Sequence, residues 1–409
     1  MRRYVIVGNG VAGITAAQTI ARADPSAEVH VFGAEPFPYY RRPHLWKFIA
    51  GELEQEKLYF RPQDWYAKHN IHLHLSARVT ALDPAAHSLT LAGGRTVDYT
   101  RLLLATGGRS FVPPFEGREQ AGVFTLRTLE DAQAIKAYAR DASTAVVIGG
   151  GLLGLETARA LVALGLHVAV IEFFPHLMPR QLDKEGAAVL QAHLKSVGLH
   201  PILTGAKTKA ILGDGHAAGV LLARGRIVGG ELVLISTGIR SRIELAREAG
   251  LEVNRGVIVD EQLRTSIPDV FAAGDVAEFA GQVYGIIPAA VEQARIAAAN
   301  MVAEGSALYT GTVMTTSLKV VGADLTCLGD ATAEGDAVVV LRHSDKTTGT
   351  YKRLALREGK IVGAILLNDE QDVPHFKRLL ITGRDVSTYQ DRLLNEDFDL
   401  KAVAQSQAA

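Results

Sequence analysis

The sequence lacks several features that would place it in particular classes of protein. It holds a single cysteine, Cys327, so no disulfide can form within the chain, and electron transfer through a cysteine pair of this chain is excluded. It has no run of about 18 apolar residues, so no transmembrane helix is expected. Lys and Arg (43) balance Asp and Glu (44) to a net charge of -1, which argues against nucleic acid or an anionic membrane as the main partner.

What remains is the composition of an ordinary globular protein. The 409 residues are 48% hydrophobic and 21% charged, and at about 150 residues per domain this length predicts two to three domains. The first apolar stretch begins directly after the letters MRR, which leaves no room for a signal peptide, so we expect a cytoplasmic protein. The 13 histidines are scattered, with no H-E-x-x-H and no cysteine cluster, so no metal site is expected.

A strand–turn–helix motif occurs at the start of the chain. The apolar stretch YVIV is typical of a strand buried on both faces of a parallel sheet. It runs into Gly8, Gly10 and Gly13, spaced as G-x-G-x-x-G, and then into an alanine-rich helical segment to residue 23. In this context the three glycines allow a tight turn, a close approach of a pyrophosphate and close helix–strand packing, with the helix N-terminus facing the phosphates. Glu35, which lies 22 residues past Gly13, is spaced to bind ribose hydroxyls.

The same motif occurs a second time near residue 145. The strand AVVI leads into Gly149, Gly151 and Gly154, a helix to residue 164, and a second strand that ends at Glu172. One such motif also occurs as an ordinary strand–helix turn, but two copies, each with an acid after the next strand, indicate two dinucleotide sites. Two dinucleotides on one chain suggest one that stays bound and one that exchanges.

The chain resembles the flavoproteins with two dinucleotide-binding domains, and four further stretches carry the resemblance. LLLATGG resembles the end of the first domain, LVLISTGIRSRIELAREAGL the strand that returns from the second, TSIPDVFAAGD the second flavin motif, and RRPHLWK the R-P-x-L-S-K stretch of the ferredoxin-reductase branch. Residues 312–378 resemble the small C-terminal domain of the rubredoxin-reductase and nitrite-reductase branch. The family includes glutathione-reductase-like enzymes, NADH oxidases and the flavin module of NADH-dependent nitrite reductase.

The resemblance implies an α/β fold with two Rossmann-like domains, glutathione-reductase-like, plus a small α+β C-terminal domain. It implies an FAD-binding domain at 1–112 and 243–311, an inserted NADH-binding domain at 113–242, a C-terminal domain at 312–378 and a tail at 379–409. We expect the C-terminal domain to be an antiparallel sheet with one packed face, and the end of the tail, LNEDFDLKAVAQSQAA, to be a frayed helix or disordered. It assigns FAD to the first glycine motif and the nicotinamide nucleotide to the second. The residues that it adds to the cofactor sites are Arg42, Ala105, Thr106, Gly107, Gly238, Gly274 and Asp275.

The second site favours NADH over NADPH. The Glu172 carboxylate would bind both ribose hydroxyls and repel a 2′-phosphate, whereas an NADPH site would place Arg or Lys just after the strand. This chain has Phe173 and Phe174 there, and the next Arg or Lys along the chain is Arg180.

Two features are expected near the flavin ring. Pro288 starts a helix that, by the resemblance, points its N-terminus at the pyrimidine edge of the flavin, where negative charge develops on reduction; it equally starts a core helix. Lys47 corresponds to a lysine that pairs in the ferredoxin-reductase branch with a glutamate after the second glycine motif, which here is Glu156, beside flavin N5. Trp46 departs from the serine of that branch. Tyr39 and Tyr40 either pack near the ring or belong to the core.

No cysteine relay accompanies these residues. Cys327 lies in an alternating apolar segment and is interpreted as a buried structural thiol. The NADH oxidases place a cysteine close to the position of His44, which here is a possible proton donor or a packed surface histidine.

Without a thiol, electrons leave directly from the flavin, and FAD can release them singly to a one-electron carrier. We therefore expect an FAD-dependent NADH oxidoreductase that serves a rubredoxin, a ferredoxin or a partner redox subunit, as a monomer or homodimer. A basic patch of Arg41, Arg42, Lys352, Arg353 and Arg357 would steer an acidic carrier, or is simply a solvated face. The alternatives are an NADH oxidase that reduces oxygen or peroxide, and a structural or sensory flavin-binding subunit.

Overall fold

The computed structural model describes residues 2–320, 323–345, 347–395 and 397–405, and the chain divides into two compact units that we describe separately. Unit 1 comprises Met1–His44, Leu53–Arg109 and Ile239–Thr312. Unit 2 comprises Leu45–Glu52, Ser110–Gly238 and Val313–Ala409. The breaks at 109/110 and 238/239 lie within four residues of the boundaries expected for the FAD-binding domain. The short segment 45–52, which lies inside the first domain in sequence, belongs to unit 2.

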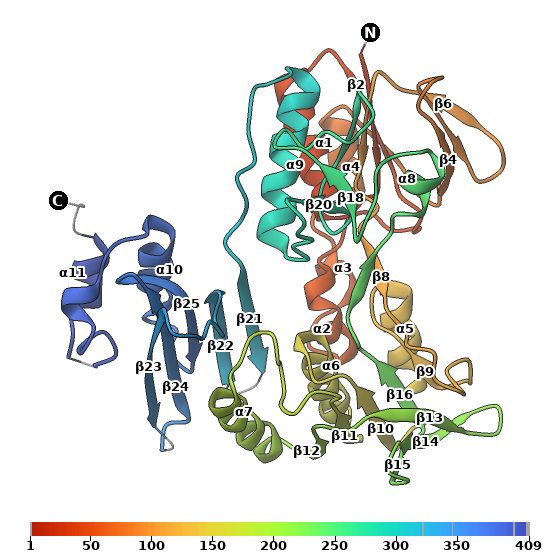
Figure 1. The fold of residues 1–409 in the computed structure, drawn as a ribbon. Helices are drawn as coiled ribbons and strands as arrows, with labels where there is room; N and C mark the ends of the chain where they lie inside the picture. Colours follow the sequence, from red (N-terminus) through yellow and green to blue (C-terminus); the bar gives the residue numbers. More distant parts are fainter. Residues whose placement is uncertain (1, 321–322, 346, 396, 406–409) are drawn as a thin grey trace. The chain divides into compact units, whose positions relative to one another are not determined.

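Unit 1 is a layered α/β unit whose elements come from all three of its chain segments (Figure 1). Its first half contains β1 (Arg3–Val7), α1 (Val11–Ala23), β2 (Glu28–Phe32), η1 (Arg42–His44), α3 (Gln55–Leu58), α4 (Gln63–Lys68), β3 (Ile71–His74), β4 (Val79–Asp83), β5 (Ser88–Leu91), β6 (Thr96–Asp98), β7 (Arg101–Leu104) and β8 (Gly108–Ser110). Its second half contains β17 (Ile239–Ser241), α8 (Glu244–Glu248), β18 (Val257–Val259), β19 (Val270–Ala272), β20 (Ala277–Phe279) and α9 (Ile287–Val302).

The centre of unit 1 is a five-stranded sheet in the order β19-β7-β1-β2-β3 with parallel pairing throughout. The middle strand β1 is buried from Tyr4 to Val7, as expected of a strand covered on both faces. Helices α1 and α9 pack against each other (Figure 1), and both carry small, fully buried side chains, among them Ala16, Ala17 and Ala294. This arrangement is the Rossmann-like layering that the sequence predicts for the first domain.

Unit 2 holds a second Rossmann-like sheet and the C-terminal domain. The first part contains α2 (Leu45–Ile49), β9 (Val123–Phe124), α5 (Leu129–Tyr138), β10 (Thr144–Ile148), α6 (Leu152–Ala163), β11 (His167–Ile171), α7 (Lys184–Ser196), β12 (Leu199–Leu203), β13 (Thr208–Gly213), β14 (Ala217–Leu222), β15 (Ile227–Gly229) and β16 (Leu232–Ile235). The C-terminal part contains β21 (Thr315–Val320), β22 (Ala323–Gly329), β23 (Val338–Asp345), β24 (Thr350–Arg357), β25 (Lys360–Leu367), α10 (Val373–Thr382), η2 (Ser387–Tyr389) and α11 (Leu400–Gln405).

The Rossmann-like sheet of unit 2 repeats the plan of unit 1. Its strands lie in the order β12-β11-β10-β16-β9 with parallel pairing, and β10 is the middle strand that leads into the second glycine motif. α6 packs on β10 and β11, and the short helix α2 packs on α5 and α6. Each copy of the glycine motif therefore directly follows the middle strand of a parallel sheet, one in each unit.

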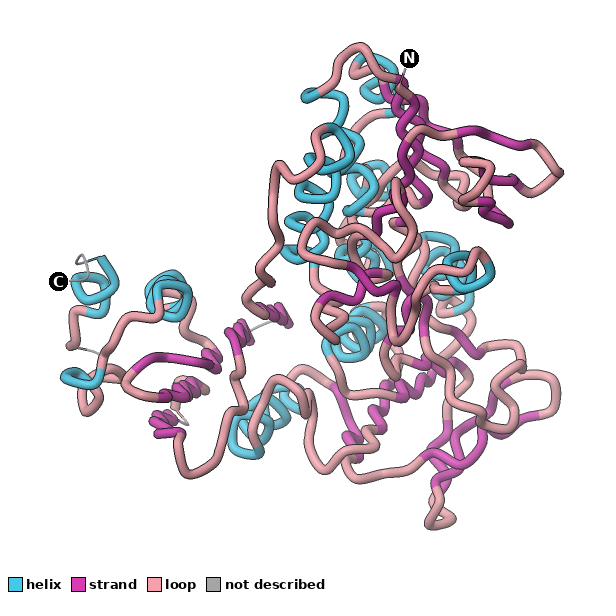
Figure 2. The backbone as a smooth tube through the Cα atoms, turned by 45° about the horizontal axis from the view of Figure 1, so that its top comes forward, coloured by secondary structure: helices cyan, strands magenta, loops and turns pink. Residues whose placement is uncertain are grey.

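The C-terminal domain is an antiparallel sheet in the order β21-β22-β25-β24-β23, shown in magenta in Figure 2, with helices beside it. The antiparallel sheet is confirmed, but the expectation of a single packed face is wrong for β24. Residues 351–356 of this strand are buried on both faces, because α7 packs against β24 and β25 while α10 packs against β25. Lys352 and Arg353 are consequently inside the structure.

A buried charge network joins α7 to β24 within unit 2. Asp183 caps the N-terminus of α7 by accepting the Gly186 N–H at 3.0 Å, and its Oδ2 accepts the Tyr351 hydroxyl at 2.6 Å. The same oxygen lies 3.3 Å from Nε of Arg353, which is fully buried. Both Arg353 terminal nitrogens donate to backbone carbonyls, those of Ala331 and Ala333.

The expectation of a frayed or disordered chain end is also wrong for residues 400–405, which form α11 with one side buried. α10 continues through Thr382, past the expected domain end at residue 378. Leu393, Leu400 and Val403 are buried in one cluster with Phe376 and Leu379 of α10. The spacing of these apolar residues is irregular, so the sequence alone shows no amphipathic stripe. Residues 406–409 lie outside the described part of the chain.

Candidate functional site

The first glycine loop has backbone geometry that only glycine accommodates. Gly8 has φ +118°, and a Cβ there would meet the Ala105 carbonyl oxygen at 2.0 Å. A Cβ on Gly13 would meet the Gly8 carbonyl oxygen at 1.9 Å, so the helix can approach the turn only without a side chain. α1 begins after Gly10, whose missing side chain leaves the helix N-terminal N–H groups uncapped. Uncapped N–H groups at a helix start are able to bind an anion.

The second loop repeats this geometry closely. Gly149 also has φ +118°, and a Cβ there would meet the Ser236 carbonyl oxygen at 2.2 Å. A Cβ on Gly154 would meet the Gly149 oxygen at 2.2 Å. Gly151 is different, because a Cβ there meets no protein atom within 4 Å and its backbone is extended (φ -85°, ψ -179°). The protein itself therefore does not require glycine at 151, which fits a position where a phosphate comes close.

Glu35 is held beside the first loop by two side chains. Arg42 donates from its terminal nitrogen to Glu35 at 2.5 Å, and the Tyr40 hydroxyl donates to the other carboxylate oxygen at 2.5 Å. Arg42 also stacks on the Tyr40 ring, and a Cβ on Gly10 would come within 3.3 Å of the guanidinium. The structure thus brings Arg42, Glu35 and the first glycine loop together. The sequence analysis did not assign the Tyr40 contact.

Two buried polar atoms near this loop suit a polar ligand. The Asn9 Oδ1 oxygen and the Arg42 Nε nitrogen are both shielded from solvent without a hydrogen-bond partner. Buried polar groups normally have hydrogen-bond partners. The unpaired acceptor in the glycine loop and the unpaired donor of the arginine beside it therefore fit a bound nucleotide that would supply the missing partners. The residues present in unit 1 therefore fit FAD.

The A-T-G stretch lies at the end of β7. The Ala105 N–H donates to the Val7 carbonyl at 2.8 Å, and the Thr106 hydroxyl donates to the Arg242 carbonyl at 2.9 Å. Gly107 has φ +68° and accepts the Arg242 N–H. These three residues belong to unit 1. Gly238, with φ +104°, belongs to unit 2.

The second flavin motif packs on the first helix. Gly274 has φ +84°, and a Cβ there would come within 3.0 Å of Cβ of Ala12 in α1. Its N–H donates to Oε1 of Gln293, a buried side chain of α9 that the sequence analysis did not single out. Asp275 follows and is half-buried. Pro288 is exposed at the start of α9, so this helix N-terminus is accessible.

Glu172 is fixed by backbone donors at the end of β11. One carboxylate oxygen accepts the Gly150 N–H at 2.6 Å and the other accepts the Phe174 N–H at 2.8 Å. The residue is 6% exposed, whereas Phe173 and Phe174 are 62% and 49% exposed. The acid is therefore oriented beside the second glycine loop, and no basic side chain occupies the two positions after it.

Lys47 and Glu156 come together within unit 2, on α2 and α6. Burial raises the pKa of Glu156 to about 8, and the charge of Lys47 acts in the opposite direction. Among the described residues the structure records no direct ion pair between the two side chains; Lys47 Nζ instead lies 5.4 Å from the centroid of the Trp46 ring. Trp46 is buried in unit 2, and Tyr39 and Tyr40 are buried in unit 1.

The remaining candidates have structural surroundings. Cys327 is 4% exposed on β22, and burial raises the pKa of its thiol to about 12, as expected of a structural thiol. His44 is half-buried at the end of η1 and donates its N–H to the Arg41 carbonyl. In the described part of the chain, no three His, Cys, Asp or Glu side chains form a group that could hold a metal.

The basic patch expected for partner steering is wrong in two of its five members. Arg353 is fully buried, and Lys352 is 9% exposed with Nζ 2.7 Å from Asp369 and 2.9 Å from Asp372. Arg42 is half-buried against Glu35. Only Arg41 and Arg357 of the expected patch are exposed.

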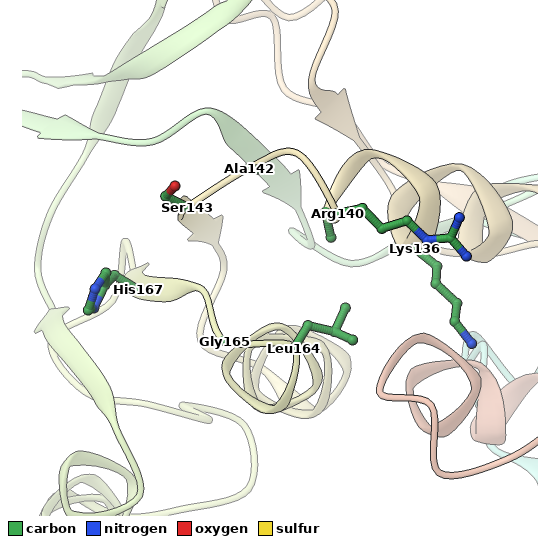
Figure 3. Close-up of a pocket in the computed structure, with 8 residues that line it drawn as sticks. Lys136, Arg140, Ala142, Ser143, Leu164, Gly165 and His167 are labelled. Carbon is green, nitrogen blue, oxygen red and sulfur yellow. The ribbon is translucent and has the colours of Figure 1, made fainter.

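A pocket of about 430 Å³ on unit 2 is separate from the nucleotide loop (Figure 3). Ser143 and His167 line it at the starts of β10 and β11, whereas the glycine loop and Glu172 follow the ends of these strands. Ligands of such sheets bind at the carboxyl ends of the strands. Figure 3 also shows Lys136 and Arg140 pointing away from His167, so the basic groups do not converge.

Two glycine loops, each at the carboxyl end of a parallel sheet with a fixed acid beside it, define a protein with two dinucleotide-binding domains. Comparison with known families agrees with this class. Residues 2–294 match the family described as pyridine nucleotide-disulphide oxidoreductase, and residues 315–384 match the rubredoxin NAD+ reductase C-terminal domain. The chain belongs to the pyridine nucleotide-disulphide oxidoreductase family. FAD and a pyridine nucleotide are accordingly its two nucleotides.

Individual relatives cover nearly the whole chain. A nitrite reductase [NAD(P)H] of Bacillus subtilis (strain 168) is 35% identical over 94% of this chain and 48% of the relative. The ferredoxin–NAD(+) reductase component of the biphenyl dioxygenase system of Paraburkholderia xenovorans (strain LB400) is 32% identical over 94% of both chains. The structure of a ferredoxin reductase for the CYP199A2 system from Rhodopseudomonas palustris superposes with a TM-score of 0.90 at 27% identity, covering 99% of this chain and 100% of that one.

Some relatives are longer than the chain. The chain spans about half the length of the first curated relatives that it matches, which are nitrite and nitrate reductase proteins. No helix among the described residues is long and apolar enough to cross a membrane.

Proposed function

We propose that the protein transfers electrons from NADH through FAD to a small electron carrier of the rubredoxin or ferredoxin type, or to a partner redox subunit, without a redox-active cysteine. The observation that carries the proposal is the pair of uncapped helix starts at two glycine loops in a chain whose one cysteine is buried. The chain then has one site for the electron donor NADH and one for the resident acceptor FAD, but no cysteine pair that could relay electrons.

The residues of unit 1 would hold FAD. The loop of Gly8, Gly10 and Gly13 would receive the pyrophosphate at the start of α1, and Glu35, oriented by Arg42 and Tyr40, would bind the ribose. By resemblance to the family, Asp275 binds the ribityl chain and the start of α9 at Pro288 faces the flavin ring. FAD supplies the chemistry that connects a two-electron donor with a one-electron carrier.

The residues of unit 2 would hold NADH. Gly149, Gly151 and Gly154 would receive its pyrophosphate at the start of α6. Glu172 would accept hydrogen bonds from the adenosine ribose, because each oxygen has lone-pair capacity beyond its one backbone donor. A 2′-phosphate in the same place would meet this carboxylate without a compensating cation, which favours NADH over NADPH.

Lys47 and Glu156 would act next to the reacting ring, as their resemblance to the lysine–glutamate pair of ferredoxin reductases suggests. At neutral pH the Glu156 carboxyl keeps its proton, since burial outweighs the charge of Lys47. The pair therefore presents one ammonium and one neutral acid group, which can stabilise negative charge and retain or release a proton at the Glu156 carboxyl.

The identity of the acceptor rests on the relatives. One full-length relative is named as a ferredoxin–NAD(+) reductase component, and the C-terminal domain matches that of rubredoxin NAD+ reductases. The nitrite reductase relatives are about twice as long, which suggests a partner redox subunit as the other option. Exposed Arg41 and Arg357 remain to attract an acidic carrier. The cytoplasmic location and the monomer or homodimer state stay predictions.

The test uses the Gly151→Val variant. A Cβ at 151 would meet no protein atom within 4 Å, so we expect the variant to fold and bind FAD while its side chain occupies the place of the NADH pyrophosphate. In anaerobic stopped-flow measurements, NADH should bleach the flavin of the wild-type protein and added rubredoxin or ferredoxin should restore its colour. G151V should keep the flavin spectrum and lose the bleaching.

Other results would contradict the proposal. A protein that cannot be loaded with FAD, or that NADH does not bleach, lacks the proposed activity, and the latter result favours a structural or sensory flavin subunit. Reoxidation by air that is fast while carriers have no effect would instead identify an NADH oxidase.

A further inference from the structure

The helix that carries Lys47 is held by its surroundings. α2 spans five residues, Leu45–Ile49, which is too short to be stable on its own. Four of the five are buried, and the helix packs on α5 and α6 of unit 2 (Figure 1). From α5, Lys136 Nζ lies 4.5 Å from the centroid of the Phe48 ring. Lys47 is half-buried and is the one residue of α2 that is not buried.

Two cations lie against the indole of Trp46. Lys47 Nζ is 5.4 Å from the ring centroid and Cζ of Arg159 is 5.2 Å from it. Both distances are within the range in which the ring quadrupole attracts a cation. Trp46 is 6% exposed, so the indole offers a fixed, largely dry surface to both groups. The ferredoxin-reductase stretch that this segment resembles has a serine in place of Trp46, and a serine offers no such surface.

Arg159 is itself tied back to α2. Its guanidinium forms an ion pair with Glu52, and the Arg159 side chain is 16% exposed. The Glu52 N–H donates to the Lys47 carbonyl at 2.9 Å. The contacts therefore close a ring from Lys47 to Trp46, Arg159, Glu52 and back to Lys47. The charge of Arg159 is balanced by Glu52, which leaves Lys47 as the unbalanced cation of this group.

Glu156 lies one helical turn before Arg159 on α6 and is largely buried. Other charged or titratable residues nearby are His167 on β11 and His200 on β12, which pack on α6, and Lys136 on α5, which packs on α2. Of all these, Lys47 is the one whose charge acts on the Glu156 carboxyl. The ammonium is close enough to influence the carboxyl, yet its recorded contact is with the indole.

We propose that Trp46 and Arg159 are positioning residues that keep the Lys47 ammonium on the indole, near the Glu156 carboxyl but not bonded to it. Arg159, anchored by Glu52, fixes the ring, and the ring holds the ammonium. Without the ring the ammonium reaches the carboxyl, which then ionises and pairs with it. The inference rests on the proposed function only for the role that the Lys47–Glu156 pair has in the reaction; the positioning itself is a property of the folded chain.

The test measures the proton on Glu156 directly. The FAD-loaded, oxidised protein is labelled with ¹³C at the glutamate carboxyl carbons and titrated by NMR without NADH, and Glu156→Gln identifies the resonance. Trp46→Leu removes the ring but keeps an apolar side chain, and Trp46→Phe is the matched control that keeps an aromatic face. We expect W46L to lower the apparent pKa of Glu156 by about one unit, a tenfold change in its acidity constant, and W46F to leave it nearly unchanged.

A second variant tests the proposal if W46L does not fold. If W46L does not fold, as judged by near-UV circular dichroism, Arg159→Gln removes the anchor instead, at a side chain that is 16% exposed, and it should lower the same pKa. W46L and W46F with equal titration curves would overturn the proposal, as would R159Q with the wild-type curve. A wild-type protein that NADH does not reduce would contradict the proposed function and leave this titration unaffected.

Discussion

Asp183→Ala should strongly destabilise unit 2. Asp183 caps α7 and is the carboxylate beside Nε of Arg353, a side chain with no exposure to solvent. The substitution removes the cap and leaves a buried guanidinium without its nearest anion. Its Ala331 and Ala333 carbonyl contacts remain, and Glu334, 3.7 Å from the guanidinium, is 68% exposed.

These contacts set the magnitude. Removing one partner of a buried ion pair costs roughly 3–5 kcal/mol, and the two carbonyl contacts that remain place the cost here near ~3 kcal/mol. Loss of the cap adds about 1 kcal/mol, so D183A should lose about 4 kcal/mol of unfolding free energy. Asp183→Asn keeps a good capping side chain and should lose only ~2–3 kcal/mol.

Arg342→Gln is the matched control. Arg342 lies 3.4 Å from the same Asp183 oxygen, but its side chain is 41% exposed. An exposed pair of this kind contributes about 0–1 kcal/mol. Urea unfolding followed by tryptophan fluorescence and far-UV circular dichroism measures all three variants. If D183N and R342Q lose the same free energy within error, the buried charge of Arg353 does not depend on Asp183 and the reasoning is refuted.

Three further predictions concern the candidate site. Glu172→Ala should raise the KM for NADH about tenfold and narrow the preference over NADPH, because one ribose anchor is worth roughly 1–3 kcal/mol; steady-state rates with both nucleotides check this, and an unchanged ratio contradicts it. Glu156 should be protonated in the folded chain and ionised in the unfolded chain between about pH 5 and pH 8, since its pKa is raised from 4.5 to about 8. Unfolding then releases a proton, so stability falls as pH rises through this window, and E156Q should lack that fall in thermal melts from pH 5 to pH 9. Cys327 should react with a thiol reagent only after unfolding, and Cys327→Ala should keep NADH oxidation at the wild-type rate, because burial raises the pKa of this thiol to about 12; rapid labelling of the native protein would show the thiol to be accessible.

The nucleotide loops could be predicted from sequence because their chemistry is local. Gly8 and Gly13, and likewise Gly149 and Gly154, are required by backbone contacts within a few residues of one strand–helix turn, so spacing alone reveals them. Glu172 follows from the length of one helix and one strand. The parallel sheets follow from apolar strands that alternate with helical segments, and the C-terminal antiparallel sheet follows from three segments that alternate in polarity.

The errors concern contacts between residues far apart in the chain. The segment TYKRLALR alternates in polarity like a strand with one solvent-exposed face. Nothing within the segment shows that α7, some 150 residues earlier, covers that face and pairs Arg353 with Asp183. The Trp46–Arg159 contact joins residues 113 positions apart. The apolar residues of the tail, Leu393, Leu400 and Val403, acquire a meaning only when α10 provides the surface on which they are buried.

The assignment of segment 45–52 to unit 2 limits how the protein can be divided. A fragment cut at 110 and 238, as the linear order of domains invites, would lose α2 and with it the apolar surface that covers parts of α5 and α6. Such a fragment would expose that surface to water and aggregate. Grafting this nucleotide domain onto another protein therefore requires carrying along an eight-residue piece, Leu45–Glu52, from a distant part of the chain, or redesigning the uncovered helices with polar side chains.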